Sequence, residues 1–291
     1  MDKQPLDGAL IDALITLARA AGDAIMAVYT SAEFGIEQKA DESPVTRADI
    51  AAHDIIAAGL ARLLDLPMIS EEAPVPPASE RQTWTRYWLV DPLDGTKEFI
   101  LRSGEFTVNI ALIEAGKPVL GVVHLPARQI TYLGVAASEA AQYNGAWKYC
   151  EGHPATRIRV RSLAQARDDN TLVVLASHRH GTGAVNALVD QLRQRWAGRV
   201  ALTNAGSSLK FCQIAEGLAD FYPRLAPTSE WDTAAAQAVL EAAGGAVVNA
   251  DESAGAWLSP LVYNGKDNVI NPDFYAVGDV NLDWPALLKR P

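Results

Sequence analysis

Few folds accommodate the stretch 106–135, in which apolar and polar residues alternate and two turns divide the chain. In its first segment, 106–112, the sequence FTVNIAL places a large apolar residue at every second position. A period of two is typical of a β-strand with one face in a core. Turns are expected at 114–118 and 126–129, where Gly or Pro interrupts the pattern. The stretch therefore predicts an antiparallel meander.

Two amphipathic helices are expected before this meander. The first lies in the N-terminal residues up to Tyr29, and its apolar face is expected to consist of Leu6, Leu10, Leu14, Leu17 and Ile25. The second opens at Thr46, and its apolar face is expected to consist of Ile50, Ile55, Ile56, Leu60 and Leu63. A Pro-rich surface loop is predicted at 73–84. A buried strand at 87–90 is expected to stop at Asp91-Pro92, because proline cannot continue a ladder.

The pattern changes near residue 155, where strands and helices begin to alternate. Strands are expected at 171–176 and 220–222, and helices at 185–196, 209–217 and 233–243. Alternating elements of this kind predict an α/β lobe. The chain is therefore expected to form one compact unit of two lobes, an α+β lobe at 1–154 and an α/β lobe at 155–291.

Charge and cysteine content exclude several classes of function. The chain has 25 Lys and Arg against 35 Asp and Glu, a net charge of −10, which argues against binding to long nucleic acid. Cys150 and Cys212 lie far apart and form neither a disulfide framework nor a zinc site. A reducing, cytoplasmic location is expected. The acids at Asp2, Asp7 and Asp12 argue against a signal peptide or an integral membrane segment.

The segment DPLDGTKEF, residues 91–99, is the sharpest indication of chemistry. Asp91 and Asp94 lie three residues apart at the end of the predicted strand, so that both can reach one metal cluster. Carboxylates suit hard cations such as Mg²⁺, which also binds substrate phosphate oxygens. Gly95 permits close backbone approach, and Thr96 opens a helix whose free N–H groups can bind an anion. A simple Asp-Gly turn is the alternative.

Three further acids allow two interpretations each. Glu71, which Glu72 follows, ends a short apolar run at 67–70 and is either a ligand of the same cation or a solvated surface acid. Asp232 precedes an Ala-rich helix and is either its N-cap or a metal ligand. Asp49 completes a T-x-x-D capping box that begins at Thr46, or has a functional role.

Other catalytic motifs are not found. The sequence has no HExxH, Walker A, GxSxG or GxGxxG motif. His178 and His180 follow the predicted strand 171–176 and are either substrate contacts or surface loop residues.

Four motifs in order make the chain resemble the lithium-sensitive, magnesium-dependent phosphatases of the inositol monophosphatase superfamily, which include fructose bisphosphatase and the bisphosphate nucleotidases. They are T-x-x-D at 46–49, the acid pair Glu71-Glu72, DPLDGT at 91–96, and WDTAA followed by AGG at 231–245. The resemblance covers nearly the whole chain. It implies an α+β fold, the layered αβαβα sandwich of inositol monophosphatase and fructose bisphosphatase.

Within this superfamily, DGTKEF and the segment 206–236 are most similar to the bacterial 3'(2'),5'-bisphosphate nucleotidases. Inositol phosphatases more often carry Thr-Asn where Lys97-Glu98 stands. The resemblance implies hydrolysis of adenosine 3',5'-bisphosphate (PAP) to AMP and phosphate, and removal of the 3'-phosphate from its sulfated precursor (PAPS). Inositol monophosphatase activity is one alternative. A noncatalytic protein that binds phosphorylated metabolites is another, which the complete set of acids disfavours.

By motif position, the resemblance assigns Glu71, Asp91 and the carbonyl oxygen of Leu93 to one Mg²⁺. It assigns Asp91, Asp94 and Asp232 to a second. Two such ions about 3.5–4 Å apart activate water and stabilise the attacking and leaving oxygens of an in-line displacement. Four of these ligands, Glu71, Leu93, Asp94 and Asp232, are also expected to contact the substrate.

The resemblance implies roles for several neighbouring groups. A third, weaker ion is expected near Glu71 and Asp49. Asp49 and Thr96 would orient the attacking water, and the N–H groups of Gly95 and Thr96 would bind phosphate oxygens.

The second lobe is expected to recognise the leaving group. By resemblance, Ser207, Ser208, Lys210 and Arg224 lie in the relevant stretch, although Lys210 and Arg224 are equally interpreted as surface charges. The first lobe would supply most metal ligands. A homodimer and a peripheral contact with the inner membrane are left open.

Overall fold

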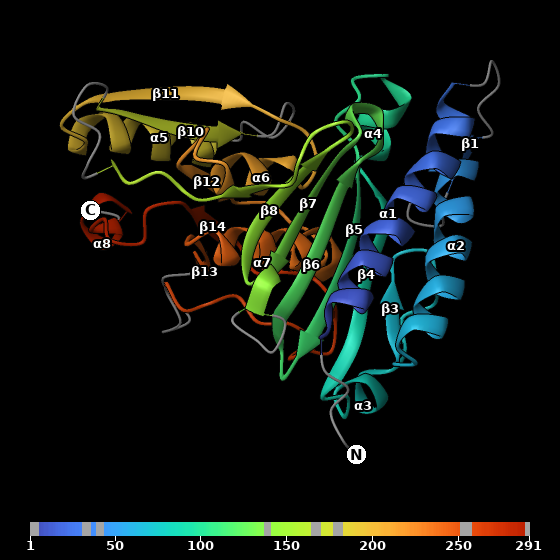
Figure 1. Cartoon of the computed structure of the whole chain (residues 1–291). Coiled ribbons are helices and arrows are strands. Elements are labelled where there is room, and N and C mark those ends of the chain that lie inside the picture. The colour runs from blue at the N-terminus through green and yellow to red at the C-terminus, as the bar shows by residue number, and fades with distance from the viewer. Residues whose placement is uncertain are drawn as a thin grey trace.

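The computed structural model describes residues 6–30, 36–38, 44–136, 141–163, 170–176, 183–250 and 258–288, so that His178 and His180 lie outside the described residues. Its elements form five layers in the order helices, sheet, helices, sheet, helices (Figure 1). Three hydrophobic clusters fill the spaces between successive layers. The expected layered αβαβα sandwich is confirmed.

The first layer consists of α1 (Gly8–Tyr29) and α2 (Arg47–Leu63). All five residues of the first predicted apolar face are buried, although Leu6 precedes α1, and on α2 Ile56 and Leu60 are buried as predicted. The prediction is wrong at Ile50, which is 45% exposed. The two helices pack so closely that a Cβ on Gly59 would lie 2.4 Å from Cδ1 of Leu17. Small residues therefore face α1, and Ile50 lies outside the contact. A hairpin of β1 (Ile36–Gln38) and β2 (Pro44–Thr46) precedes α2.

The second layer is a seven-stranded sheet in the order β3-β4-β5-β6-β7-β8-β9. Its strands are β3 (Met68–Ser70), β4 (Arg86–Asp94), β5 (Thr107–Glu114), β6 (Lys117–Leu125), β7 (Ile130–Val135), β8 (Gly145–Cys150) and β9 (Thr156–Ile158). Only β3 and β4 pair in parallel. The antiparallel meander is confirmed in β5–β7, and it continues into β8 and β9, which the sequence pattern does not predict.

Strand β4 does not stop at Asp91, contrary to the prediction. It runs through Pro92 to Asp94, and its pairing with β5 changes from Asp91 opposite Asn109 to Asp94 opposite Thr107. Three steps along β4 thus match two along β5, which is a β-bulge. A bulge leaves one residue unpaired, so the strand can contain Pro92, which has no N–H to donate. It also re-aims the side chains at the end of the strand.

The middle layer holds α6 (Leu209–Ala215) and α7 (Ala234–Ala242) between the two sheets. Both helices confirm predictions. Two glycines allow α7 to approach the first sheet. A Cβ on Gly121 would lie 2.1 Å from the carbonyl oxygen of Ala235, and one on Gly134 would lie 2.4 Å from that of Ala238. The position of α7 therefore depends on the lack of a side chain at Gly121 of β6 and at Gly134 of β7.

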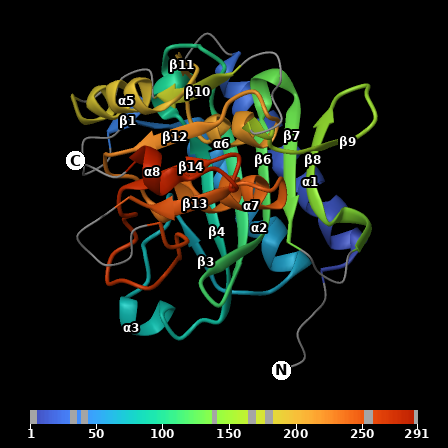
Figure 2. The ribbon, with the colours of Figure 1, turned by 90° about the vertical axis from the view of Figure 1, so that its left-hand side faces the viewer.

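The fourth layer is a five-stranded sheet in the order β11-β10-β12-β14-β13. Its strands are β10 (Thr171–Ala176), β11 (Arg199–Asn204), β12 (Phe221–Arg224), β13 (Ala246–Asn249) and β14 (Phe274–Val277). The outer helices are α5 (Gly183–Arg195) and α8 (Trp284–Leu288). Figure 2 shows this sheet in front of α6 and α7. The sequence predicts β10, β12 and α5, whereas β11, β13, β14 and α8 were not predicted.

The segment 73–84 is not simply a surface loop. It contains the helical turn α3 (Ala78–Arg81), and the side chain of Arg81 is fully buried. Its guanidinium donates hydrogen bonds to Oδ1 of Asn264 and to the carbonyl oxygens of Lys266 and Asp267. This prediction was wrong because the partners lie far along the chain. No helix among the described residues is long and apolar enough to cross a membrane.

Candidate metal centre and adjoining cavity

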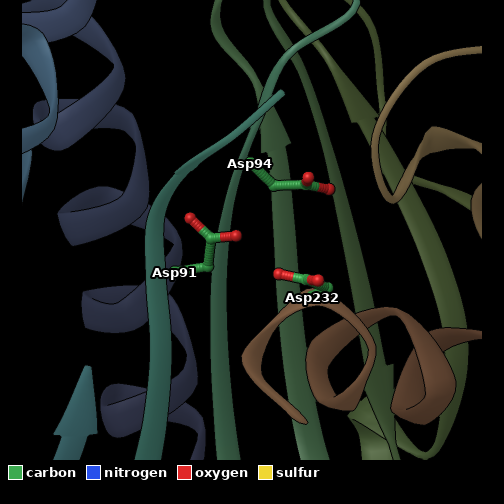
Figure 3. Close-up of side chains that lie close together, drawn as sticks. All are labelled: Asp91, Asp94 and Asp232. Atoms are coloured by element: carbon green, nitrogen blue, oxygen red, sulfur yellow. The ribbon is translucent and has the colours of Figure 1, made fainter. Parts of the chain in front are cut away.

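Three carboxylates converge where β4 ends beside the short 3₁₀ turn Glu230–Asp232 (Figure 3). Asp91 and Asp94 come from the bulged end of β4, and Asp232 from the turn before α7. One carboxylate oxygen from each lies within 4.8 Å of the others. Two of the acids come from the first sheet and the third from the turn before α7, so the site depends on how the two sheets pack around α6 and α7.

Asp91 is the most enclosed of the three, with 1% of its surface exposed. Its Oδ1 accepts a hydrogen bond from the N–H of Leu93 (3.0 Å), which fixes the carboxylate within the bulge. No hydrogen bond reaches its Oδ2 from the described part of the chain. Burial raises the pKa of Asp91 well above its usual value, and the charges of Glu71, Asp94, Asp232 and Asp49 raise it further. This is a buried oxygen that requires a cation or a proton.

Asp94 is held by hydrogen bonds from the turn before α6 and from β5. Its Oδ2 accepts hydrogen bonds from the N–H of Ser208 (2.6 Å) and from Oγ1 of Thr107 (3.5 Å). Burial raises its pKa, and this rise is opposed by the positive charge of Lys210 and by the hydrogen bonds from Ser208. Asp94 therefore links the first sheet to the turn before α6.

Asp232 does not cap α7, although capping is the simpler interpretation of its sequence. The N-cap position belongs to Thr233, and Oδ2 of Asp232 accepts a hydrogen bond from the N–H of Ser229 (2.9 Å) inside the 3₁₀ turn. Burial, then the charges of Asp94 and Glu71, raise its pKa well above the usual value. This geometry leaves a carboxylate oxygen of Asp232 directed at the other two acids.

Glu71 and Asp49 supply further negative charge near this cluster. Glu71 directly follows β3, and its N–H donates to the carbonyl oxygen of Val90, the residue before Asp91. Asp49 lies in the first turn of α2 and is 1% exposed. Both charges raise the pKa of Asp91.

The turn after Asp94 has the conformation that glycine favours. Gly95 has φ +93°, and α4 (Thr96–Ile100) begins at the next residue, as predicted. A Cβ on Gly95 would lie 3.3 Å from Cβ of Ser207 and 3.4 Å from the carbonyl oxygen of Glu105. Replacement of this glycine would therefore strain the turn and crowd Ser207 and Glu105.

A cavity of about 150 Å³ adjoins the acidic cluster. Ser207, Lys210 and Arg224 line it together with Asp94 and Asp232. Lys210 is only 5% exposed, so its interpretation as a surface charge is wrong. Burial lowers its pKa to about 8, against the attraction of Asp94. The aromatic rings of Phe211, Tyr222 and Phe274 complete part of the wall.

Ser208 joins the parts of the site, a role that its neighbours in sequence do not indicate. Its N–H donates to Asp94, and its Oγ donates to the backbone carbonyl of Asp232 (2.7 Å) and accepts from Nδ2 of Asn109 (3.0 Å). In the sequence, Asn109 stands only as a polar residue between the apolar positions 108 and 110 of the predicted meander. Asn109 is 1% exposed on β5, and this burial of a polar side chain, which the sequence does not show, is what indicates that it has a partner.

Residues 8–277 match the inositol monophosphatase family. The chain belongs to this family. It is 47% identical over 268 residues to the 3'(2'),5'-bisphosphate nucleotidase CysQ of Escherichia coli (strain K12), covering 91% of this chain and 98% of that protein. The crystal structure of CysQ from Bacteroides thetaiotaomicron superposes with a TM-score of 0.78 at 37% identity, covering 94% of this chain and 98% of that chain. The extragenic suppressor protein suhB from Bartonella henselae, at 22% identity and a TM-score of 0.72 with 97% and 99% covered, shows the same fold.

The inositol monophosphatase family is metal-dependent, and membership implies a phosphorylated small-molecule substrate. The donor set fits a metal of this kind. Asp91, Asp94 and Asp232 offer only hard oxygen ligands, and one buried oxygen of Asp91 has no hydrogen-bond donor in the described chain. Mutual repulsion of the three carboxylates is relieved when a divalent cation binds among them.

Proposed function

We propose that the chain is a magnesium-dependent 3'(2'),5'-bisphosphate nucleotidase that hydrolyses adenosine 3',5'-bisphosphate to AMP and phosphate. The observation that carries this proposal is the convergence of Asp91, Asp94 and Asp232 beside a cavity lined by Lys210 and Arg224. Acids that bind cations and cations that bind phosphate thus adjoin each other. The 47% identity to the E. coli nucleotidase supports this substrate class.

The acids divide into two ligand sets in this proposal. Glu71, Asp91 and the carbonyl oxygen of Leu93 hold one Mg²⁺, and Asp91, Asp94 and Asp232 hold a second. A third ion near Asp49 and Glu71 gives two to three in all. When bound, the ions neutralise the carboxylates, acidify a water and stabilise charge on the phosphoryl oxygens.

The remaining groups position the reactants. Asp49 and Thr96 orient the attacking water by accepting its hydrogen bonds, and the N–H groups of Gly95 and Thr96 donate to phosphate oxygens. The water oxygen bonds to the 3'-phosphorus, the bond from phosphorus to the 3'-oxygen breaks, and that oxygen leaves with a proton. The products are AMP and inorganic phosphate, with no covalent phosphoenzyme.

The second lobe recognises the rest of the nucleotide in this proposal. Ser207, Lys210 and Arg224 line the cavity and supply hydrogen bonds and positive charge. We assign most metal ligands to a lobe at 1–154, and Asp232 with the leaving-group contacts to a lobe at 155–291. PAPS, which keeps the same 3'-phosphate, is a second proposed substrate. A cytoplasmic location fits a nucleotide substrate and the two unpaired cysteines.

The proposal is tested by phosphate release from adenosine 3',5'-bisphosphate and from inositol 1-phosphate, each with Mg²⁺ and with EDTA. We expect magnesium-dependent release with a strong preference for the nucleotide. Preference for inositol 1-phosphate would support the alternative inositol monophosphatase activity. Failure to release phosphate from either substrate would favour a noncatalytic binding protein.

A further inference from the structure

The cavity beside the acidic cluster carries three cations on its wall: Lys97, Lys210 and Arg224. In a bisphosphate substrate, the phosphate that is hydrolysed lies at the acidic cluster, where bound cations hold it. The second phosphate must then find positive charge elsewhere in the cavity, because an unpaired anion in a partly buried site loses its hydration without compensation. The three cations differ in how far their donors are already committed.

Lys210 has most of its donors engaged within the protein. Its Nζ donates to the carbonyl oxygens of Ala205 (3.3 Å) and Ser207 (2.7 Å), and it lies 5.1 Å from the ring centre of Tyr222. The side chain is buried. Lys210 therefore fixes the turn at 205–208 and contributes positive potential, with a single N–H left for a ligand.

Arg224 is also committed in part. Its Nε donates to the carbonyl oxygen of Ala226 (3.0 Å), and its Nη2 donates to that of Pro227 (2.9 Å). These bonds hold the guanidinium against the backbone that follows β12. Two of its five donors serve the protein, and its orientation is fixed by them.

Lys97 differs from both. It is exposed, and within the described ranges no hydrogen bond or ion pair joins its side chain to another residue. It lies in the first turn of α4, one residue after Thr96. Its acidic neighbour Glu98 packs at the turn of Gly206, where a Cβ would lie 2.8 Å from Cγ of Glu98. All three N–H donors of Lys97 are thus available on a long, flexible stem.

We propose that Lys97 binds the phosphate that is not hydrolysed and is a specificity-determining residue that favours bisphosphates over monophosphates. This inference rests on the proposed function. Lys210 and Arg224 form the fixed part of this positive wall, and the exposed ammonium of Lys97 adds three N–H donors on a flexible stem that can follow the second phosphate. A substrate with one phosphate leaves Lys97 without a ligand and gains nothing from it.

The experiment compares the wild type with Lys97→Ala, Lys97→Arg and the control Lys117→Ala. Lys117 is an exposed lysine at the start of β6, where it pairs with Glu114 at the end of β5 opposite to Thr107. The kcat and KM are measured for adenosine 3',5'-bisphosphate and adenosine 3'-monophosphate, together with inhibition by AMP. In Lys97→Ala we expect KM for the bisphosphate and the inhibition constant of AMP to rise about 10-fold.

The expected pattern is selective. The kcat for the bisphosphate and the KM for adenosine 3'-monophosphate stay within about twofold of wild type, Lys97→Arg restores most of the affinity, and Lys117→Ala changes nothing. Unchanged KM for the bisphosphate and unchanged inhibition by AMP in Lys97→Ala would overturn the role of Lys97 alone. A wild type that releases no phosphate from the bisphosphate would overturn the proposed function, and the role of Lys97 with it.

Discussion

Replacement of Asp91 by Asn is expected to stabilise the metal-free protein while it abolishes activity. The carboxylate is buried and lies among the charges of Glu71, Asp94, Asp232 and Asp49, all of which raise its pKa. The stability that the protonated carboxyl contributes is lost as the pH rises through its folded-state pKa. An amide carries no charge and still offers an oxygen to the N–H of Leu93.

The expected gain follows from the distances in the cluster. Two charges 4.8 Å apart repel by about 3.5 kcal/mol at an effective dielectric constant of about 20. Asp91 takes part in two such pairs, with Asp94 and Asp232, for about 7 kcal/mol when all three are ionised. Protonation in the wild type relieves part of this repulsion, so we expect a gain of about 3 kcal/mol. In a chain of this size that corresponds to a rise in Tm of about 6 °C.

Thermal unfolding is measured for wild type, Asp91→Asn and the control Asp54→Asn, whose carboxylate is exposed on α2. In EDTA at pH 8, Asp91→Asn should melt above wild type, and the difference should shrink at pH 5 as the wild-type cluster takes up protons. Saturating Mg²⁺ should raise the Tm of wild type and of the control far more than that of Asp91→Asn. If Asp91→Asn melts below wild type in EDTA, or gains as much from Mg²⁺, the electrostatic argument is wrong.

Three further variants test other parts of the structure. Ser208→Ala keeps the N–H that binds Asp94 but loses the Oγ contacts, so we expect kcat to fall about 10-fold and KM to change little; equal kcat would refute its positioning role. Gly134→Ala should lower Tm by several degrees and reduce kcat, because its Cβ would displace α7 and with it Asp232; a wild-type melting curve would contradict this packing. Burial lowers the pKa of His124 to about 4, so folding should lose up to about 3 kcal/mol between pH 6.5 and pH 4 as the unfolded chain takes up a proton; denaturant titrations of His124→Gln should show a smaller loss, and an equal loss would exclude His124 as the cause.

The elements that the sequence predicts have a visible period or a turn at each end. The meander of β5–β7 and the buried face of α1 follow from such patterns. Strand β14 could not be found in this way, because its four residues are buried on both faces and show no period. Its register is set by β12 and β13, which the local sequence does not contain.

Some features of the site can likewise be predicted from the local sequence and others cannot. The spacing of Asp91 and Asp94 indicates one cluster, but the bulge that aims both carboxylates at Asp232 depends on pairing with Asn109 and Thr107 of β5. For Asp232 the local sequence favours a helix cap, and only the approach of Asp91 and Asp94 on β4 distinguishes the two interpretations. The contacts of Ser208 with Asn109 and Asp94, and the burial of Arg81, involve partners about 100 or more residues away, so no local pattern predicts them.

The most direct test of the account is a titration of Mg²⁺ into wild type and Asp94→Asn by calorimetry, with phosphate release from adenosine 3',5'-bisphosphate measured on the same preparations. The account predicts that wild type binds Mg²⁺, and that Asp94→Asn binds it at least 10-fold more weakly and loses orders of magnitude in kcat. Wild-type magnesium affinity and turnover in Asp94→Asn would contradict the assignment of the three aspartates to a catalytic metal centre.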